Sequence, residues 1–95
     1  AAAARAGDAL RARLAEGLSG TQGVVEIRGR GMMTGIELAV DATALPRQAL
    51  EAGLLINVTA GNVVRLVPPL TLGEEEIRQL ADGVIDLVRR HLAAT

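Results

Sequence analysis

The chain has 95 residues, a mass of 9.8 kDa and a formal net charge of −1, which limits it to a single domain over residues 1–95. Hydrophobic residues make up 49% of the sequence, but no uninterrupted run approaches the roughly 18 that a membrane span requires. We therefore expect a folded, soluble chain that is not secreted. Because the first residue is Ala and not Met, we expect a fragment or a processed chain.

Several kinds of chemistry are excluded because the residues that they need are missing. The sequence contains no Cys, Phe, Trp, Tyr or Lys, and His91 is its single imidazole. Disulfides, thiolate catalysis, a self-contained zinc site and a Schiff base are therefore ruled out for this chain alone. Without aromatic side chains or a basic charge, a nucleic-acid surface is not expected either. We expect no catalytic, cofactor-binding or metal-binding residue, and neither nucleic acid nor a membrane as a partner.

The first half of the chain predicts one helix and two strands. Residues 1–18 are rich in helix formers, and leucines four residues apart give this segment one apolar side. From residue 24 the hydrophobic period changes to two, with Val25 and Ile27 on one side of a predicted strand. A second alternating segment covers residues 33–40, and the glycines between the two segments are expected to join or bend them.

The next segment predicts a short helix and a hairpin. Thr43 is a candidate N-cap, and Gly53 is placed where a left-handed C-terminal residue is favoured. Residues 54–58 and 63–67 are short apolar strands, and the turn-forming residues 59–62 separate them.

The last segment predicts a long helix after the double proline at 68–69, which ends the preceding strand. Thr71 and Glu74 match a capping box, and an apolar stripe runs from residue 77 to residue 88. The element order is therefore helix, strand, strand, helix, strand, strand, helix. This order predicts a two-layer α+β domain with a small antiparallel sheet and helices on one face.

The glycine-rich segment with Gly29, Gly31 and Gly35 has the wrong spacing for a dinucleotide-binding fingerprint and leads into a strand instead of a helix. A bulge or tight bend is the better interpretation. Arg28 and Arg30 beside these glycines could contact an anion, but a solvated turn is the simpler explanation.

Other polar residues are explained by local structure more simply than by chemistry. Ser19 and His91 could belong to a nucleophile–base pair, yet each lies at the end of a predicted helix. Residues 74–76 are three Glu in a first helical turn, where negative charge complements the helix dipole, so a metal site is not expected. Asn57 and Thr59 flank a turn and could orient a ligand, but turn hydrogen bonding is the simpler interpretation.

Arg65 stands out because it lies in the middle of the apolar segment 63–67. A guanidinium on the same side of the strand as Val63 and Val67 needs water or an anion. In one interpretation the segment is an edge strand whose charge prevents aggregation. In another, the guanidinium holds a carboxylate through two parallel hydrogen bonds. The residues alone leave both interpretations open.

A resemblance covers essentially the whole chain, in the right order. It rests on GRGMM at 29–33, GIEL at 35–38, GLLIN at 53–57, VRLVPPL at 64–70 and the helix start at 71–76. With these segments the chain resembles the C-terminal small domain of class III, ornithine-type, pyridoxal phosphate-dependent aminotransferases of fold type I. Residues 54–70 are most similar to acetylornithine aminotransferases. The short link at residues 39–45 departs from the family pattern and is expected to affect only a surface loop.

The resemblance implies a parent enzyme that transfers an amino group from N-acetylornithine to 2-oxoglutarate in arginine biosynthesis, as a cytoplasmic homodimer. A large domain, absent from these 95 residues, would carry the Schiff-base lysine and the pyridoxal phosphate. Arg65 would be the substrate-binding residue, a ligand for the carboxylate of amino-acid and 2-oxo-acid substrates. The fragment alone is expected to be inactive and to bind no cofactor.

Two other classes of protein fit the same periodicity. One is a free-standing ferredoxin-like regulatory module that binds a small molecule such as an amino acid. The other is a structural module that pairs with a partner chain through its sheet edge. Sequence upstream of residue 1 would separate both from the aminotransferase.

Overall fold

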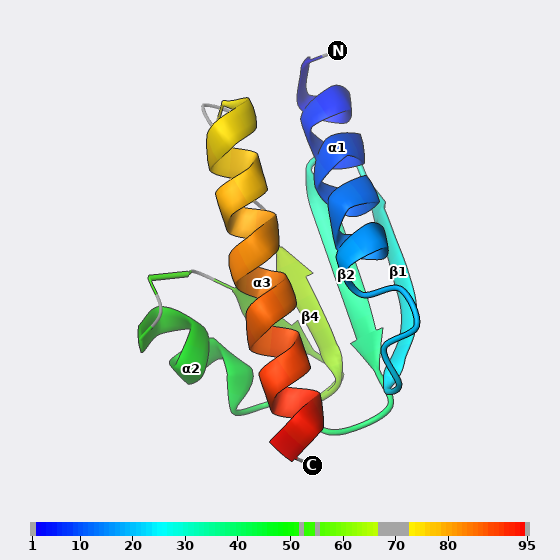
Figure 1. Ribbon diagram of the computed structural model, residues 1–95, viewed down its shortest axis with the longest axis vertical. Helices are drawn as coiled ribbons and strands as arrows, with labels where there is room; N and C mark the ends of the chain where they lie inside the picture. Colours follow the sequence, from blue (N-terminus) through cyan, green and yellow to red (C-terminus); the bar gives the residue numbers. More distant parts are fainter. Residues whose placement is uncertain (1, 52, 55, 67–72, 95) are drawn as a thin grey trace.

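The computed structural model describes residues 2–51, 53–54, 56–66 and 73–94. Within these residues the chain forms three helices and four strands in the predicted order (Figure 1). Their bounds are α1 Ala2–Gly17, β1 Val24–Arg30, β2 Met33–Leu38, α2 Leu45–Glu51, β3 Asn57–Thr59, β4 Val63–Leu66 and α3 Glu74–Ala94. The strands form one antiparallel sheet in the order β1-β2-β4-β3, so β2 and β4 lie in its interior.

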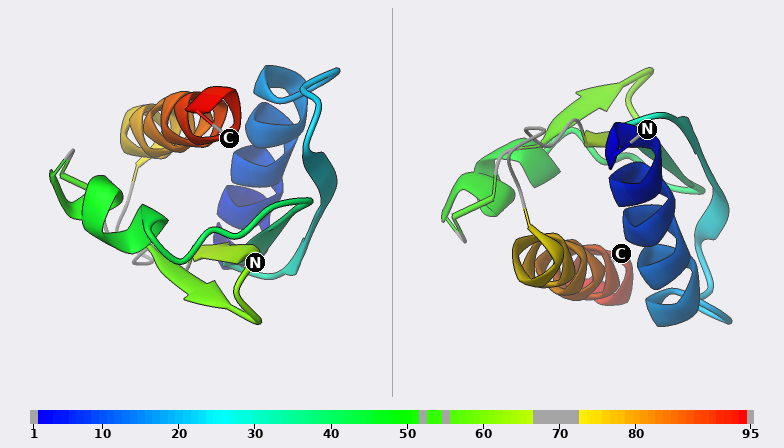
Figure 2. Two further views of the ribbon diagram at one scale, coloured as in Figure 1. Left: turned by 90° about the horizontal axis from the view of Figure 1, so that it is seen from below. Right: turned by 90° about the horizontal axis from the view of Figure 1, so that it is seen from above.

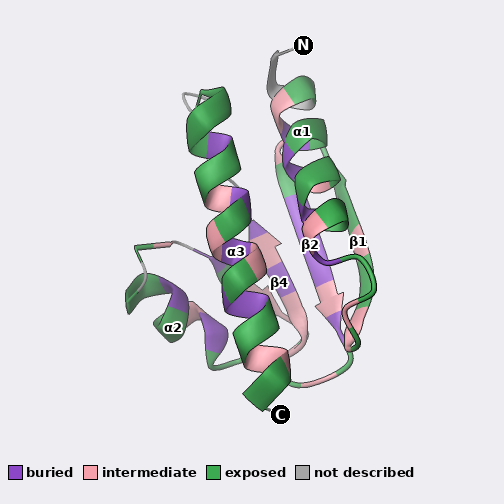
Figure 3. Cartoon of the chain, in the orientation of Figure 1, coloured by how far each residue is buried: buried purple, intermediate pink, exposed green. Residues whose placement is uncertain are grey.

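The helices and the sheet form two layers. Helices α1 and α3 pack against each other on the same side of the sheet, and α2 lies beside α3 near β3 (Figures 1 and 2). The buried positions of α1 and α3 lie on the sides of these helices that face the sheet, as the colouring of Figure 3 shows. No helix in the described part of the chain crosses the opposite face of the sheet. The predicted α+β architecture is thereby confirmed.

The core consists of aliphatic side chains from the three helices, from strands β2 and β4, and from the loops next to these elements. Its members are Leu10, Leu14, Leu18, Ile36, Leu38, Ala42, Leu45, Ala49, Ile56, Val64, Leu66, Ile77, Ala81, Val84, Leu87 and Val88. This cluster explains why the leucine spacing of the first helix and the stripe of the last helix predicted both elements correctly. No helix that the structure describes is long and apolar enough to cross a membrane.

Strand β1 differs from the predicted alternation. Its register with β2 shifts between Val24 and Glu26, which marks a β-bulge. Val24 and Ile27 therefore pack against the core, while the side chain of Val25 is 56% exposed. The prediction that Val25 and Ile27 lie on the same side of the strand was wrong, because the bulge inserts one extra residue into the alternation of sides.

Helix α2 ends as predicted but begins differently. Gly53 adopts φ +81°, and the amide of Leu54 donates to the carbonyl of Ala49 at 2.7 Å, the 6→1 bond of a Schellman motif. Leu54 therefore belongs to the helix terminus, and the strand predicted at 54–58 begins only with β3. Thr43 is not the N-cap, because α2 starts at Leu45 and the Thr43 hydroxyl donates to the Asp41 carboxylate at 2.7 Å.

Helix α3 begins at Glu74, so the predicted capping box is shifted. The backbone amide of Gly73 donates to Oε1 of Glu76 at 3.0 Å, which makes Gly73 the N-cap and Glu76 the residue that reaches back. Glu74 does not have that role. Thr71 and the double proline at 68–69 lie outside the described residues.

Candidate carboxylate-binding site

The face of the sheet that no described helix covers carries a row of four residues, one from each strand. Arg28 pairs with Gly35, Gly35 with Arg65, and Arg65 with Asn57. Directly paired residues of antiparallel strands point to the same face, so these four side-chain positions all point away from the helices. The adjacent residues Val64 and Leu66 on β4 point into the core and are fully buried or nearly so.

A shallow depression of about 650 Å³ lies on this face. It is lined by Arg28, Gly29, Met33, Gly35, Thr59, Val63 and Arg65. Apolar and glycine positions form most of its surface, and two guanidinium groups border it. The two arginines differ in their partners, which decides what each can bind.

Arg28 is already neutralised by carboxylates. Its Nη1 donates to Oε1 of Glu37 at 2.8 Å and lies 3.8 Å from Oε1 of Glu26. The side-chain hydrogen bond with Glu37 raises the pKa of Arg28, with a further contribution from the charge of Glu26. Arg28 is exposed and ion-paired, so the prediction that it lies in solvent is confirmed.

Arg65 has no such partner. Within the described residues it makes no ion pair, and its one side-chain hydrogen bond runs from Nη2 to Sδ of Met33 at 3.3 Å. A thioether is a weak acceptor and leaves the charge of the guanidinium uncompensated. The half-buried Arg65 can therefore present its planar donor edge to an incoming carboxylate.

The position of Arg65 in the sheet removes one of its two interpretations. Strand β4 pairs with β2 on one side and with β3 on the other, so it is an interior strand. The interpretation of Arg65 as a charge that protects a sheet edge is wrong. Hydrogen bonding on both sides also holds the backbone at Arg65 stiffly, which favours a fixed direction of the side chain.

The glycines at the β1–β2 turn are needed for the backbone conformation, as predicted. Gly31 adopts φ +59° at the first position of the turn. A methyl group at Gly29 would overlap the carbonyl oxygen of Met33. The turn directs carbonyl oxygens toward Arg11 of α1, whose Nη1 lies 3.0 Å from the oxygen of Gly31 and 2.9 Å from that of Met33. Carbonyl oxygens that accept hydrogen bonds from a guanidinium do not bind an anion, so this arrangement is not an anion-binding site.

Sequence reasoning did not find Arg11. The residue follows the buried Leu10, and its side chain is only 16% exposed. It also approaches the hydroxyl of Thr34, a fully buried polar side chain, at 3.3 Å. The position of Arg11 in the sequence could have indicated this role, because a residue next to a core leucine of an amphipathic helix borders the buried face.

The remaining candidates have local roles. Nε2 of His91 lies 2.7 Å from the carbonyl oxygen of Asp41, which ties the end of α3 to the loop before α2, and Ser19 is exposed beyond α1. The Oδ1 atom of Asn57 accepts from the amide of Val58, as expected near a turn. Among the described residues, no three Asp, Glu or His side chains are placed to hold a metal ion.

Comparison with known proteins identifies the family. The family described as Aminotransferase class-III matches residues 1–88. "Acetylornithine aminotransferase 1" of Bordetella pertussis is 51% identical over 84 residues, and the acetylornithine aminotransferase of Methanothermobacter thermautotrophicus is 44% identical over 86. These alignments cover 88% and 90% of this chain but 21% of each relative. The chain belongs to the class III aminotransferase family.

Solved structures agree with this assignment. The ornithine aminotransferase of Toxoplasma gondii matches with a TM-score of 0.87 and 31% identity, covering 99% of this chain and 23% of that one. The acetylornithine aminotransferase of Elizabethkingia anophelis matches with a TM-score of 0.83 and 26% identity, covering 94% and 24%. The chain thus spans about a quarter or less of the proteins that it resembles. The comparison favours the aminotransferase over the regulatory module and the sheet-edge module.

Proposed function

We propose that residues 1–95 are the C-terminal small domain of an acetylornithine aminotransferase, and that this domain closes over the substrate and binds its carboxylate through Arg65. The complete enzyme would transfer the amino group of N-acetylornithine to 2-oxoglutarate, giving N-acetylglutamate semialdehyde and glutamate in arginine biosynthesis. The domain's partner would be a large catalytic domain of the same polypeptide. We expect that enzyme to be a cytoplasmic homodimer.

One observation carries the role of Arg65. Its guanidinium lies on an interior strand, at a depression of about 650 Å³, and no carboxylate among the described residues neutralises it. N-acetylornithine gives up the amino group at the opposite end of its chain from its carboxylate, whereas 2-oxoglutarate has a carboxylate next to the carbon that receives the amino group. A fork of N–H donors on a stiff strand can hold that carboxylate in one orientation, which brings the reacting carbon to a fixed place.

Pyridoxal phosphate, the cofactor of class III aminotransferases, would not be attached covalently to this chain. The chain has no Lys, so it cannot supply the amine to which the cofactor is covalently attached. The cofactor would be held by residues of the large domain. The contribution that we assign to this chain is substrate binding.

A domain replacement tests the proposal. The segment of the Bordetella pertussis protein that aligns with this chain would be replaced by residues 1–95, and turnover of N-acetylornithine with 2-oxoglutarate would be measured. The chimera should transaminate this pair and prefer N-acetylornithine to ornithine. A chimera that is folded and binds the cofactor, shown by its absorbance spectrum, but gives no turnover above background would contradict the proposal.

A further inference from the structure

Arg28 and Arg65 occupy equivalent places on either side of β2. Both pair directly with Gly35, Arg28 from β1 and Arg65 from β4. Both side chains also border the depression on the uncovered face of the sheet. They differ in their charge partners, since Arg28 is ion-paired and Arg65 is not within the described residues. This difference depends on the placement of the nearby carboxylates.

The four strands that the structure describes carry two carboxylates, Glu26 on β1 and Glu37 on β2. The two residues pair with each other and lie on the same face as the arginines, because they are two residues away from Arg28 and Gly35 respectively. Like charges directly opposite each other in a sheet repel. Arg28 relieves this repulsion, since its Nη1 lies 2.8 Å from Oε1 of Glu37 and 3.8 Å from that of Glu26.

Glu37 is also a neighbour of Arg65. Its direct partner on β4 is Val63, two residues before Arg65, so Glu37 and Arg65 are diagonal neighbours on one face of the sheet. Diagonal neighbours are about 7 to 8 Å apart, a separation that long side chains can span. Glu26 is one strand farther from Arg65. Of the two carboxylates on the strands, Glu37 is therefore the one that can reach the guanidinium of Arg65.

Other side chains on this face already bridge such diagonals. The hydrogen bond of 2.8 Å between Arg28 and Glu37 spans one diagonal, and Arg65 reaches Met33 at 3.3 Å across another. If Glu37 were released, it would compete with Met33 for Arg65. A carboxylate is a much stronger acceptor for a guanidinium than a thioether is. The resulting ion pair would occupy the donor edge of Arg65 that the substrate carboxylate needs.

We infer that Arg28 is a positioning residue of the site: by holding Glu37, it keeps the guanidinium of Arg65 free for the substrate carboxylate. The inference rests on the proposed function and gives Arg28 no contact with the substrate. Without Arg28, the carboxylate of Glu37 becomes an internal competitor for Arg65. Such a competitor lowers the fraction of enzyme that can bind substrate, so it raises KM and leaves kcat at saturating substrate unchanged.

Arg28→Gln in the complete aminotransferase tests the inference, with 2-oxoglutarate varied at saturating N-acetylornithine. KM for 2-oxoglutarate should rise roughly two- to sixfold, the effect expected from an exposed ion pair that competes with substrate, and kcat should not change. Two double variants identify the cause. Arg28→Gln with Glu37→Gln should restore KM, whereas Arg28→Gln with Glu26→Gln should not.

The two double variants are matched controls. They have the same net charge, and both remove the repulsion between the paired carboxylates. If Arg28 acted only through stability or through the overall charge of this face, the two would therefore behave alike. Equal KM values in the two double variants would overturn the inference, as would a failure of Glu37→Gln to restore KM.

Arg65→Ala, measured beside these variants, separates failure of the inference from failure of the proposed function. If Arg65→Ala lowers kcat/KM for 2-oxoglutarate but Arg28→Gln leaves KM unchanged, Glu37 does not compete for Arg65 and only this inference is overturned. If Arg65→Ala leaves kcat/KM unchanged, the proposed function of Arg65 is overturned as well.

Discussion

The guanidinium of Arg11 on α1 donates a hydrogen bond of 3.0 Å to the carbonyl oxygen of Gly31 at the β1–β2 turn. The same Nη1 lies 2.9 Å from the carbonyl oxygen of Met33. One side chain of the helical layer therefore holds the turn of the hairpin that carries Met33 and Gly35. Through this contact, the first helix stabilises one wall of the candidate site.

Arg11→Met should destabilise the domain. The substitution keeps the length of the side chain but leaves two carbonyl oxygens and the Thr34 hydroxyl without their donor, at a cost of about 1 to 3 kcal/mol. Urea unfolding of the 95-residue chain measures this loss. The control is Asp8→Asn, which removes only the exposed partner of Arg11 and should cost less. Equal stability of wild type and Arg11→Met would contradict this account of the turn.

Gly7→Ala should also destabilise the domain, although Ala is the better helix former. Helix α1 approaches the β1–β2 turn so closely that a methyl group at Gly7 would overlap the carbonyl oxygen of Gly31. Relief of this overlap requires a backbone shift, with an expected cost of about 1 to 3 kcal/mol. Gly83→Ala on α3 is the matched control, because its new methyl group would meet only the flexible side chain of Leu54, at 3.1 Å. It should be neutral or stabilising by up to about 1 kcal/mol in a thermal unfolding experiment.

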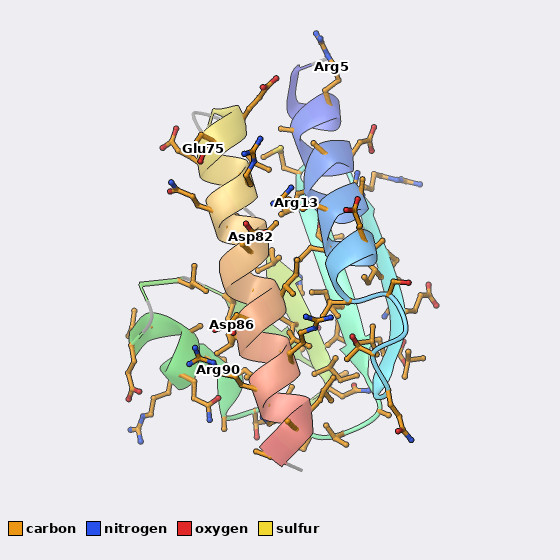
Figure 4. All side chains as sticks on the ribbon, viewed as in Figure 1. Arg5, Arg13, Glu75, Asp82, Asp86 and Arg90 are labelled. Carbon is orange, nitrogen blue, oxygen red and sulfur yellow. The ribbon has the colours of Figure 1, made fainter. Side chains whose placement is uncertain are left out.

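The ion pair between Arg13 and Asp82 predicts a dependence of stability on pH. Nε of Arg13 on α1 lies 2.8 Å from Oδ1 of Asp82 on α3, where the two helices run side by side (Figure 4). The hydrogen bond from Arg13 lowers the pKa of Asp82 below its ordinary value of 3.8, and the charges of Arg13 and Arg78 lower it further. A carboxyl group with a lowered pKa in the folded state stabilises the fold above its ordinary pKa, and this contribution is lost as the pH falls through the folded value.

Asp82→Asn should therefore be less stable than wild type at pH 7, and the difference should shrink when the pH is lowered below about 4. Denaturant unfolding at pH 7 and at pH 2 to 3 checks this. Arg13→Gln should give the same loss at pH 7, and the double variant should lose little more than either single variant. A difference that does not depend on pH would show that Asp82 acts through something other than its charge.

The 95-residue chain mixed with pyridoxal phosphate and both substrates should show no amino transfer above the rate of the free cofactor. The reason is chemical, since without Lys the chain cannot form the internal Schiff base. Absorbance of the cofactor and appearance of glutamate would be followed together. Turnover above that background would disprove the assignment of the cofactor chemistry to another domain.

The fold was predictable wherever hydrophobic periodicity continues over several turns or residue pairs. The leucine stripe of α1 and the apolar stripe of α3 fall on buried positions, and the β1–β2 pairing follows from two alternating segments around glycines. The bulge at Val25 was not predictable, because an inserted residue changes the side of a strand without changing its composition. The end of α2 also extends into the predicted strand, since the Leu54 amide completes the helix terminus.

Part of the candidate site was visible in the sequence, and part depends on strand order. A charged residue inside an apolar strand singled out Arg65, but the sequence left open whether this strand was at an edge. The order β1-β2-β4-β3 resolves that question and also brings Gly35 and Met33 next to Arg65, although about 30 residues separate them along the chain. Tertiary contacts of this kind have no local signal.

The central claim is that Arg65 binds the substrate carboxylate, and steady-state kinetics of Arg65 variants in the complete aminotransferase test it most directly. Arg65→Lys should lower kcat/KM for 2-oxoglutarate, whose carboxylate adjoins the reacting carbon, since a point charge replaces a planar fork. Arg65→Ala should lower it further, with a total loss of about 2 to 5 kcal/mol and little change in melting temperature. Arg47→Ala removes an exposed arginine of α2 and should leave the kinetics unchanged. Unchanged kcat/KM for 2-oxoglutarate in Arg65→Ala would contradict the account, as would a loss of stability without a selective effect on this kcat/KM.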